Sequence, residues 1–187
     1  MYLLLFLTFL VGLVVGNTES VLINVPKGFN AISNGDSQFH MLDMGHRLVS
    51  KRTIEFEVDS VRPYQVVELS NVQSRKNYQI KVCWSAIEGY DIRDVGYVMA
   101  HSGQDINIPD VGSLGLAKSD SIFLYFRVDQ DTYPRIPDGY KTEVNLSVVN
   151  LVAYIPIDCM PMIFFLALAI LPFIYILRTN KHMDLFR

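Results

Sequence analysis

The sequence lacks the features that mark most enzymes and nucleic-acid-binding proteins. It has no glycine-rich phosphate loop and none of the motifs HExxH, CxxC and GxSxG, so it supports no catalytic role, metal site or cofactor. It has no basic excess either, because 19 Asp and Glu residues outnumber 16 Lys and Arg residues and give a net charge of −3. A nucleic-acid partner would need a basic surface, so that class is excluded. Half of the 187 residues are apolar, which excludes a disordered tail.

Charged side chains are absent from two long stretches, one near each end of the chain. Residues 1–16, MYLLLFLTFLVGLVVG, precede the polar NTES and place Val14 and Gly16 at the small-residue positions expected before a signal peptidase cut. The stretch is short for a membrane span, which needs about 20 residues. We therefore predict a cleaved signal peptide here, in preference to an uncleaved anchor. Residues 17–159 are then enough for one domain and too few for two.

The second uncharged stretch, residues 160–177, is predicted to be a transmembrane helix. Its 18 residues would span roughly 27 Å as a helix, which suits the thinner bilayer of the endoplasmic reticulum. Residues 178–187 carry three Lys and Arg residues against one Asp. We therefore expect a cytosolic tail and a lumenal N-terminal domain, which is a single-pass type I arrangement.

Two prolines lie inside this expected span: Pro161, which is tolerated in the opening turn of a helix, and Pro172, which lies deeper in it. A proline there kinks the helix or leaves a carbonyl in need of a partner, and a kinked helix often packs on another. Proline is also commoner in membrane helices than in soluble ones, so both interpretations stay open. The span has no GxxxG motif, and dimerisation through it is unsupported.

The segment between the two ends alternates apolar and polar residues with period two. Ile54, Phe56 and Val58 alternate with acidic residues, and residues 78–84 alternate in the same way up to Trp84. This pattern is typical of half-buried strands. Further strand candidates, separated by turn residues, lie at 21–25, 64–69, 95–99, 105–108, 122–128 and 143–151. We predict an all-β lumenal domain, an antiparallel β-sandwich or jelly roll, with a long loop over residues 27–47.

The two cysteines and one glycosylation sequon are the candidate modification sites. Cys83 lies in a predicted strand on the face opposite Trp84, and Cys159 lies at the expected membrane boundary. A lumenal setting permits a disulfide between them if their Cα atoms come within about 7 Å, and two free thiols are equally compatible. The sequon is Asn145-Leu146-Ser147, so Asn145 is the glycosylation candidate.

Three short constellations resemble catalytic or metal sites. The stretch 129–131, Asp-Gln-Asp, has the D-x-D form that holds a divalent metal in some glycosyltransferases, and residues 34–37, Asn-Gly-Asp-Ser, contain the Gly-Asp-Ser block of one esterase family. His40, Asp43 and His46 could form a metal cluster. In an all-β setting the ordinary interpretation is an acidic connection and polar turns. We expect no catalytic residue at Asp129 or Ser37.

Two short motifs, together with the layout, resemble a known family. The motifs are the expected mature start, residues 17–20 (NTES), and the strand VCWSA at residues 82–86. The chain resembles the fungal co-activator of glycosylphosphatidylinositol (GPI) mannosyltransferase II, a small endoplasmic-reticulum protein with a signal peptide, a lumenal domain, one C-terminal span and a short cytosolic tail. This layout is shared with the lumenal subunit of GPI mannosyltransferase I.

The resemblance implies a subunit without catalytic activity of its own. Such a subunit would bind and stabilise a polytopic catalytic partner that adds the second mannose to the GPI precursor, and it would also contact membrane lipid. We infer that Trp84 and Cys83 maintain the lumenal domain core. Pro172 with Phe164, Phe165 and Phe173 forms the candidate surface for packing against a partner helix.

Other functions remain compatible with the same layout. One alternative is an accessory subunit of another endoplasmic-reticulum complex, including mannosyltransferase I. A second is a cell-surface adhesion or receptor domain of immunoglobulin-like type. The short span favours retention in the reticulum over the cell surface, so the location of the protein separates these alternatives.

Overall fold

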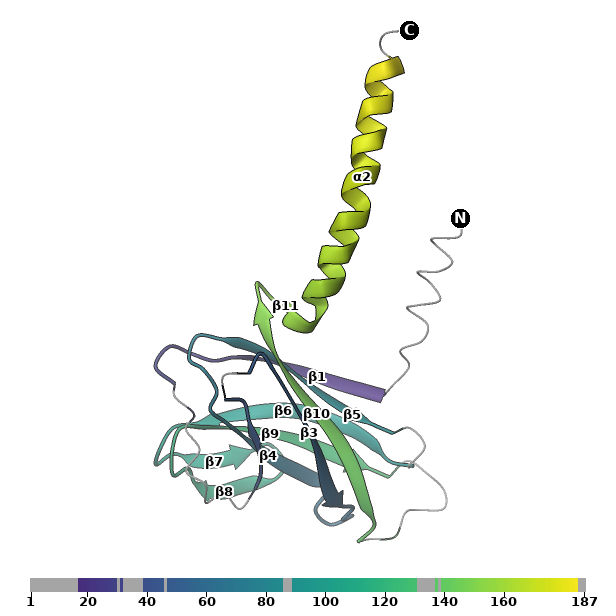
Figure 1. Cartoon of the computed structure of the whole chain (residues 1–187). Helices are drawn as coiled ribbons and strands as arrows, with labels where there is room; N and C mark the ends of the chain where they lie inside the picture. The colour runs from purple at the N-terminus through teal and green to yellow at the C-terminus, as the bar shows by residue number, and fades with distance from the viewer. Residues whose placement is uncertain are drawn as a thin grey trace.

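The computed structural model describes residues 17–29, 31, 39–45, 47–85, 89–130, 137 and 139–184. Within these residues, two β-sheets pack face to face, and a single helix leaves one end of the pair (Figure 1). The all-β prediction is thereby confirmed. The predicted signal peptide, residues 1–16, lies outside the described residues.

The first sheet has five strands, and β10 (Lys141–Val152) lies at its centre. On one side β10 pairs with β5 (Asn77–Trp84), which pairs in turn with β1 (Asn17–Asn24). On the other side β10 pairs with β3 (Val49–Glu57), and its end pairs with the short β11 (Ile155–Pro156). All of these pairings are antiparallel, so the last long strand of the domain lies between strands from its first half.

The second sheet has four strands in the order β2, β4, β9, β6. Their bounds are β2 (His40–Asp43), β4 (Tyr64–Ser70), β9 (Ser121–Asp129) and β6 (Asp91–Ala100). A separate hairpin of β7 (Asp105–Ile108) and β8 (Gly112–Leu116) forms a two-stranded sheet beside it. The pairing of β2 with β4 is parallel. All other strand pairings among the described residues are antiparallel, so the antiparallel prediction holds for every ladder except this one.

The core lies between the two sheets because alternate side chains of each strand point inward. In β5 the inward residues end at Trp84, while Cys83 lies half-buried on the outer face. From the other sheet, Leu124 and Phe126 are fully buried against them. Burying one such side chain stabilises the fold by about 1.5–3 kcal/mol. Trp84 therefore belongs to the core, and Cys83, which was expected to accompany it there, does not.

The stretch predicted as one long loop, residues 27–47, is structured in part, so that prediction was wrong. It contains β2 and an isolated bridge between Ala31 and Val72. Phe29 is only 1% exposed and packs edge-on against the ring of His101, with ring centroids 5.3 Å apart. A four-residue strand is too short for period-two alternation to be visible, so the sequence pattern could not indicate it.

The C-terminal segment forms a 3-10 turn at Ile157–Cys159 followed by helix α2 (Met160–Asp184). Its apolar side chains project into open space, including Phe164 and Phe165, whose rings contact each other with centroids 6.4 Å apart. Pro172 lies inside the helix. Among the described residues, no helix meets both the length and the hydropathy required of a membrane span. The span expected at residues 160–177 stays a prediction.

Candidate partner-binding surfaces

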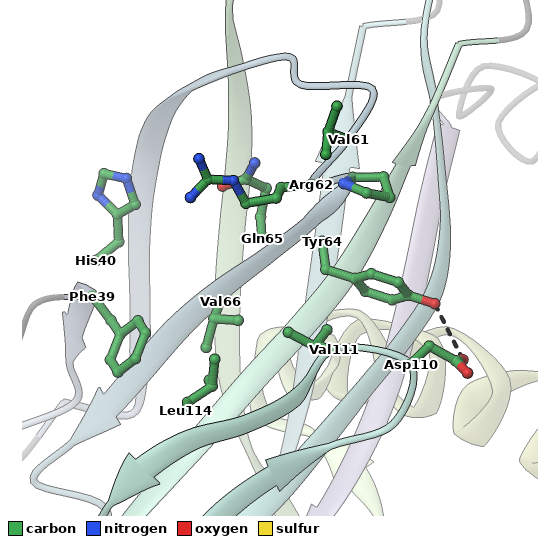
Figure 2. A pocket seen from close by; sticks show the side chains of 11 residues that line it. Phe39, His40, Val61, Arg62, Tyr64, Gln65, Val66, Asp110, Val111 and Leu114 are labelled. Atoms are coloured by element: carbon green, nitrogen blue, oxygen red, sulfur yellow. Dashed lines mark hydrogen bonds between the residues drawn. The ribbon is translucent and has the colours of Figure 1, made fainter.

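A groove on the outer face of the four-stranded sheet is the first candidate surface. It encloses about 580 Å³ between the start of β4 and the β7–β8 hairpin (Figure 2). We call it the β4 groove, and its lining residues are Phe39, His40, Val61, Arg62, Pro63, Tyr64, Gln65, Val66, Asp110, Val111 and Leu114. Segments far apart in the sequence therefore meet in it.

The β4 groove combines an apolar floor with charged side chains at its rim. Phe39 is held by an edge contact with Phe123, with ring centroids 5.7 Å apart. The Tyr64 hydroxyl donates a hydrogen bond to Asp110 Oδ2 at 3.3 Å. Partial desolvation raises the pKa of Tyr64, which favours the protonated hydroxyl that donates this hydrogen bond. The guanidinium of Arg62 is largely exposed and pairs with Asp59 at 3.6 Å. Such a groove, apolar at its floor and polar at its rim, suits an apolar side chain of a partner.

A network of ion pairs lies at one end of β9, centred on Arg127. Its guanidinium donates to both oxygens of Asp129, at 2.8 and 2.7 Å, and contacts Asp94 Oδ2 at 3.0 Å. The hydrogen bonds that Arg127 donates to the Asp129 carboxylate raise the pKa of Arg127 above its ordinary value. A bidentate pair of this kind satisfies the Asp129 carboxylate. Asp129 therefore acts as the partner of an arginine, and Asp131 lies outside the described residues.

Of the three residues considered as a metal cluster, His40, Asp43 and His46, the two that the structure describes have separate roles. Asp43 Oδ1 accepts hydrogen bonds from the backbone N–H of Gly45 at 2.9 Å and from Asn71 Nδ2 at 2.7 Å, which is typical of a turn-stabilising carboxylate. His40 lines the β4 groove. His46 and Ser37 lie outside the described residues. Within the part of the chain that is described, no three His, Cys, Asp or Glu side chains are grouped closely enough to hold a metal ion.

The outer face of the five-stranded sheet carries a polar hollow of about 450 Å³ that includes Asn145 and Cys83. Asn145 is exposed, and its Oδ1 accepts a hydrogen bond from Thr53 Oγ1 at 2.7 Å. Lys81 Nζ contacts Asp158 Oδ2 at 3.3 Å, which ties the 3-10 turn to the sheet. Cys83 and Cys159 are both free thiols, each partly exposed. Of the two arrangements considered from the sequence, this structure has the free thiols, and pairing of the two cysteines stays an untested alternative.

Helix α2 is a further candidate surface. Its large apolar side chains are exposed along the described length: Met162, Ile163, Phe164, Phe165, Leu166, Leu168, Ile170, Leu171, Ile174 and Tyr175. Three of the four candidate packing residues can be placed: Phe164, Phe165 and Pro172 are all exposed on this helix. The side chain of Phe173 is not described. An apolar helix surface of this size is a site for lipid or for another protein.

Sequence reasoning missed the β4 groove. Tyr64 and Asp110, which meet through a hydrogen bond there, are 46 positions apart. Neither residue belongs to a motif, and only the folding of the β7–β8 hairpin against β4 brings them together. The single signal in the sequence was the Pro63 turn before β4, which indicates a strand boundary and gives no information on a binding site.

Comparison with known proteins identifies a family. The family model described as "Pga1: GPI-Mannosyltransferase II co-activator" matches residues 7–181. No curated protein and no solved structure matches the chain.

Proposed function

The chain belongs to the family of GPI-mannosyltransferase II co-activators, and from this premise we propose that it binds and stabilises a multi-spanning mannosyltransferase without catalysing the transfer itself. Membership of the family assigns the chain to GPI-anchor biosynthesis and associates it with the endoplasmic reticulum. The family description also makes it an accessory component of the mannosyltransferase. The reaction it supports would be the addition of the second mannose, carried out by the catalytic partner.

The observation that carries this proposal is the exposed apolar surface of α2. Its large apolar side chains are exposed from Met162 to Tyr175. A helix that is apolar on all sides is stable only where lipid or protein surrounds it. We propose that residues 160–177 cross the membrane once, with the β-domain in the lumen, and that α2 packs there against helices of the catalytic subunit. Cleavage of residues 1–16 as a signal peptide and glycosylation of Asn145 belong to the same arrangement.

Pro172 gives this packing a specific location. A proline has no N–H to donate to the carbonyl four residues earlier, which is that of Leu168. In a bilayer an unsatisfied carbonyl is costly, and a donor from a neighbouring helix can satisfy it. We therefore expect a polar side chain of the catalytic subunit to lie opposite this turn, with Phe164 and Phe165 packing on the same partner one to two turns earlier.

The test is co-purification of the tagged full chain from a mild detergent, with mass spectrometry of the proteins that accompany it. Replacing residues 160–177 with a generic poly-leucine helix should abolish recovery of the mannosyltransferase, while the emission of Trp84, the only tryptophan, reports that the β-domain is still folded. Unchanged recovery would contradict packing through α2. Recovery of the chain alone, accessible to surface label, would favour a receptor function instead.

The β4 groove is the proposed lumenal contact with the same partner. Its apolar floor and the exposed Arg62 suit a loop that presents an apolar side chain beside an acidic one. Val111 lines the groove, whereas Leu116, on the same hairpin, does not line it and is more exposed. Val111→Lys should weaken co-purification, and Leu116→Lys serves as the matched control. Equal recovery with both variants would show that the groove is not the contact.

A further inference from the structure

We propose that the tip of the β10–β11 hairpin, residues 152–155, inserts into the interfacial region of the lipid bilayer beside α2. This inference rests on the proposed membrane location of α2 and adds a second lipid contact to it. The tip exposes three large apolar side chains: Val152 at 48%, Tyr154 at 76% and Ile155 at 38%. Among the described residues, the domain leaves all three side chains partly or largely exposed, and an exposed apolar cluster of this kind marks a contact site.

The backbone of the tip has an unfavourable conformation that presents these side chains outward. Val152 pairs with Ile155, so Ala153 and Tyr154 form a two-residue turn. Both have positive φ, 51° and 66°, a region that suits Asn and Gly far better than alanine or tyrosine. A tyrosine in a left-handed turn is therefore a costly way to close a hairpin. Backbone strain of this kind is concentrated at functional positions, and here it holds the Tyr154 ring in solvent.

The position of the tip relative to α2 identifies the lipid surface as its partner. Only the 3-10 turn Ile157–Cys159 separates β11 from the start of α2 at Met160. The ion pair between Lys81 and Asp158, at 3.3 Å, fixes that turn on the outer face of the five-stranded sheet. Figure 1 shows the tip beside the first turns of α2, at the same end of the sandwich. If α2 enters the bilayer at Met160, the tip reaches the headgroup level.

The chemistry of the tip also fits this depth. Tyrosine has an apolar ring with one polar end, and it is enriched at membrane interfaces for that reason. Val152 and Ile155, on either side of the turn, add apolar surface without charge. A contact at two points, the helix and the tip, would hold the β-domain in one orientation on the membrane, whereas the helix alone would leave it free to tilt.

Tryptophan quenching by brominated lipid tests the proposal. The natural Trp84 is buried in the core at 8% exposure, so its emission is the internal reference. The variants Tyr154→Trp and Tyr140→Trp each add one tryptophan at an exposed tyrosine, the second immediately before the opposite end of β10. A third variant, Phe165→Trp, reports on α2. Each full-length variant is reconstituted in phosphatidylcholine vesicles with bromine near the headgroup end of the acyl chains.

We expect the added tryptophan of Tyr154→Trp to emit at shorter wavelength and to be quenched by the brominated lipid. The added tryptophan of Tyr140→Trp should not be quenched. If Phe165→Trp is quenched and Tyr154→Trp is not, the tip proposal is overturned while the membrane location of α2 holds. If neither is quenched, the membrane location itself fails, and the tip proposal fails with it. A change in Tyr154→Trp that requires the co-reconstituted catalytic subunit would assign the tip to that protein and overturn the lipid contact.

Discussion

Substitution of Gly96 by alanine is predicted to destabilise the β-domain through one aromatic ring. Gly96 pairs with Tyr125 across the β6–β9 ladder, and the tyrosine ring covers the glycine so closely that an added Cβ would clash with Oη and lie 2.5 Å from Cζ. The ring would have to move by about 1 Å to reach ordinary contact. Tyr125 also packs near Tyr64, with ring centroids 6.5 Å apart, so a displaced ring disturbs the side of the β4 groove.

The size of the effect follows from two opposing contributions. Overpacking of this kind costs about 1–3 kcal/mol, while replacing a strand glycine by alanine gains about 0.5–1 kcal/mol through chain entropy. The expected net loss is about 0–2.5 kcal/mol. For a domain of this size each kcal/mol shifts Tm by about 4 °C, so Gly96→Ala should lower Tm by up to about 10 °C, measured by Trp84 fluorescence of the full chain in detergent.

A double-mutant cycle isolates the ring as the cause. In a Tyr125→Ala background the added methyl group has nothing to displace, so Gly96→Ala should become neutral or stabilising there. The loss of Tm caused by Gly96→Ala would then disappear or reverse in the background that lacks the ring. An equal loss of Tm with and without the ring would refute the reasoning and point to the backbone of β6 instead.

Three further predictions concern single side chains. Burial raises the pKa of Tyr78, whose hydroxyl accepts a hydrogen bond from the Gln73 N–H at 3.1 Å. The stability that the protonated Tyr78 side chain contributes is therefore present below about pH 10 and is lost as the pH rises above it. Replacing Tyr78 by Phe should flatten the alkaline fall in Tm. Phe29→Ala should lower the free energy of unfolding by about 3–5 kcal/mol in a urea titration, and a loss below about 1 kcal/mol would contradict its place in the core. Asp129→Asn should lower Tm by weakening the pairing with Arg127 yet still support mannosyltransferase activity in a complementation assay, whereas a catalytic carboxylate predicts lost activity at unchanged Tm.

The sequence was most informative where a strand is long and half-buried. The alternation that ends at Trp84 predicted β5, because inward and outward side chains differ clearly in polarity over eight residues. It did not predict β2, whose four residues include a single fully buried one, Leu42. It also did not predict β8, where two glycines within Gly112–Leu116 obscure any pattern. Both strands border or support the β4 groove, and for that reason the groove was missed.

Pairing between distant strands was beyond any local pattern. The parallel register of β2 with β4 and the central place of β10 depend on which surfaces fit once the chain is compact. Backbone conformation at single residues was equally hidden. Ala153 and Tyr154 have no turn preference, and only the short hairpin into β11 requires positive φ from them.

Because β10 lies at the centre of its sheet, that sheet can close only after β10 has been synthesised. During synthesis β1, β3 and β5 are made first, but the two halves of their sheet are joined only when β10 enters between β3 and β5. The strand that completes the sheet ends at Val152, and α2 begins only a few residues later, at Met160. Closure of the sheet and emergence of the helix therefore fall at nearly the same moment of synthesis. Until then two strand edges stay open to chaperones and to aggregation, and a chain that stops short of β10 would keep both edges open.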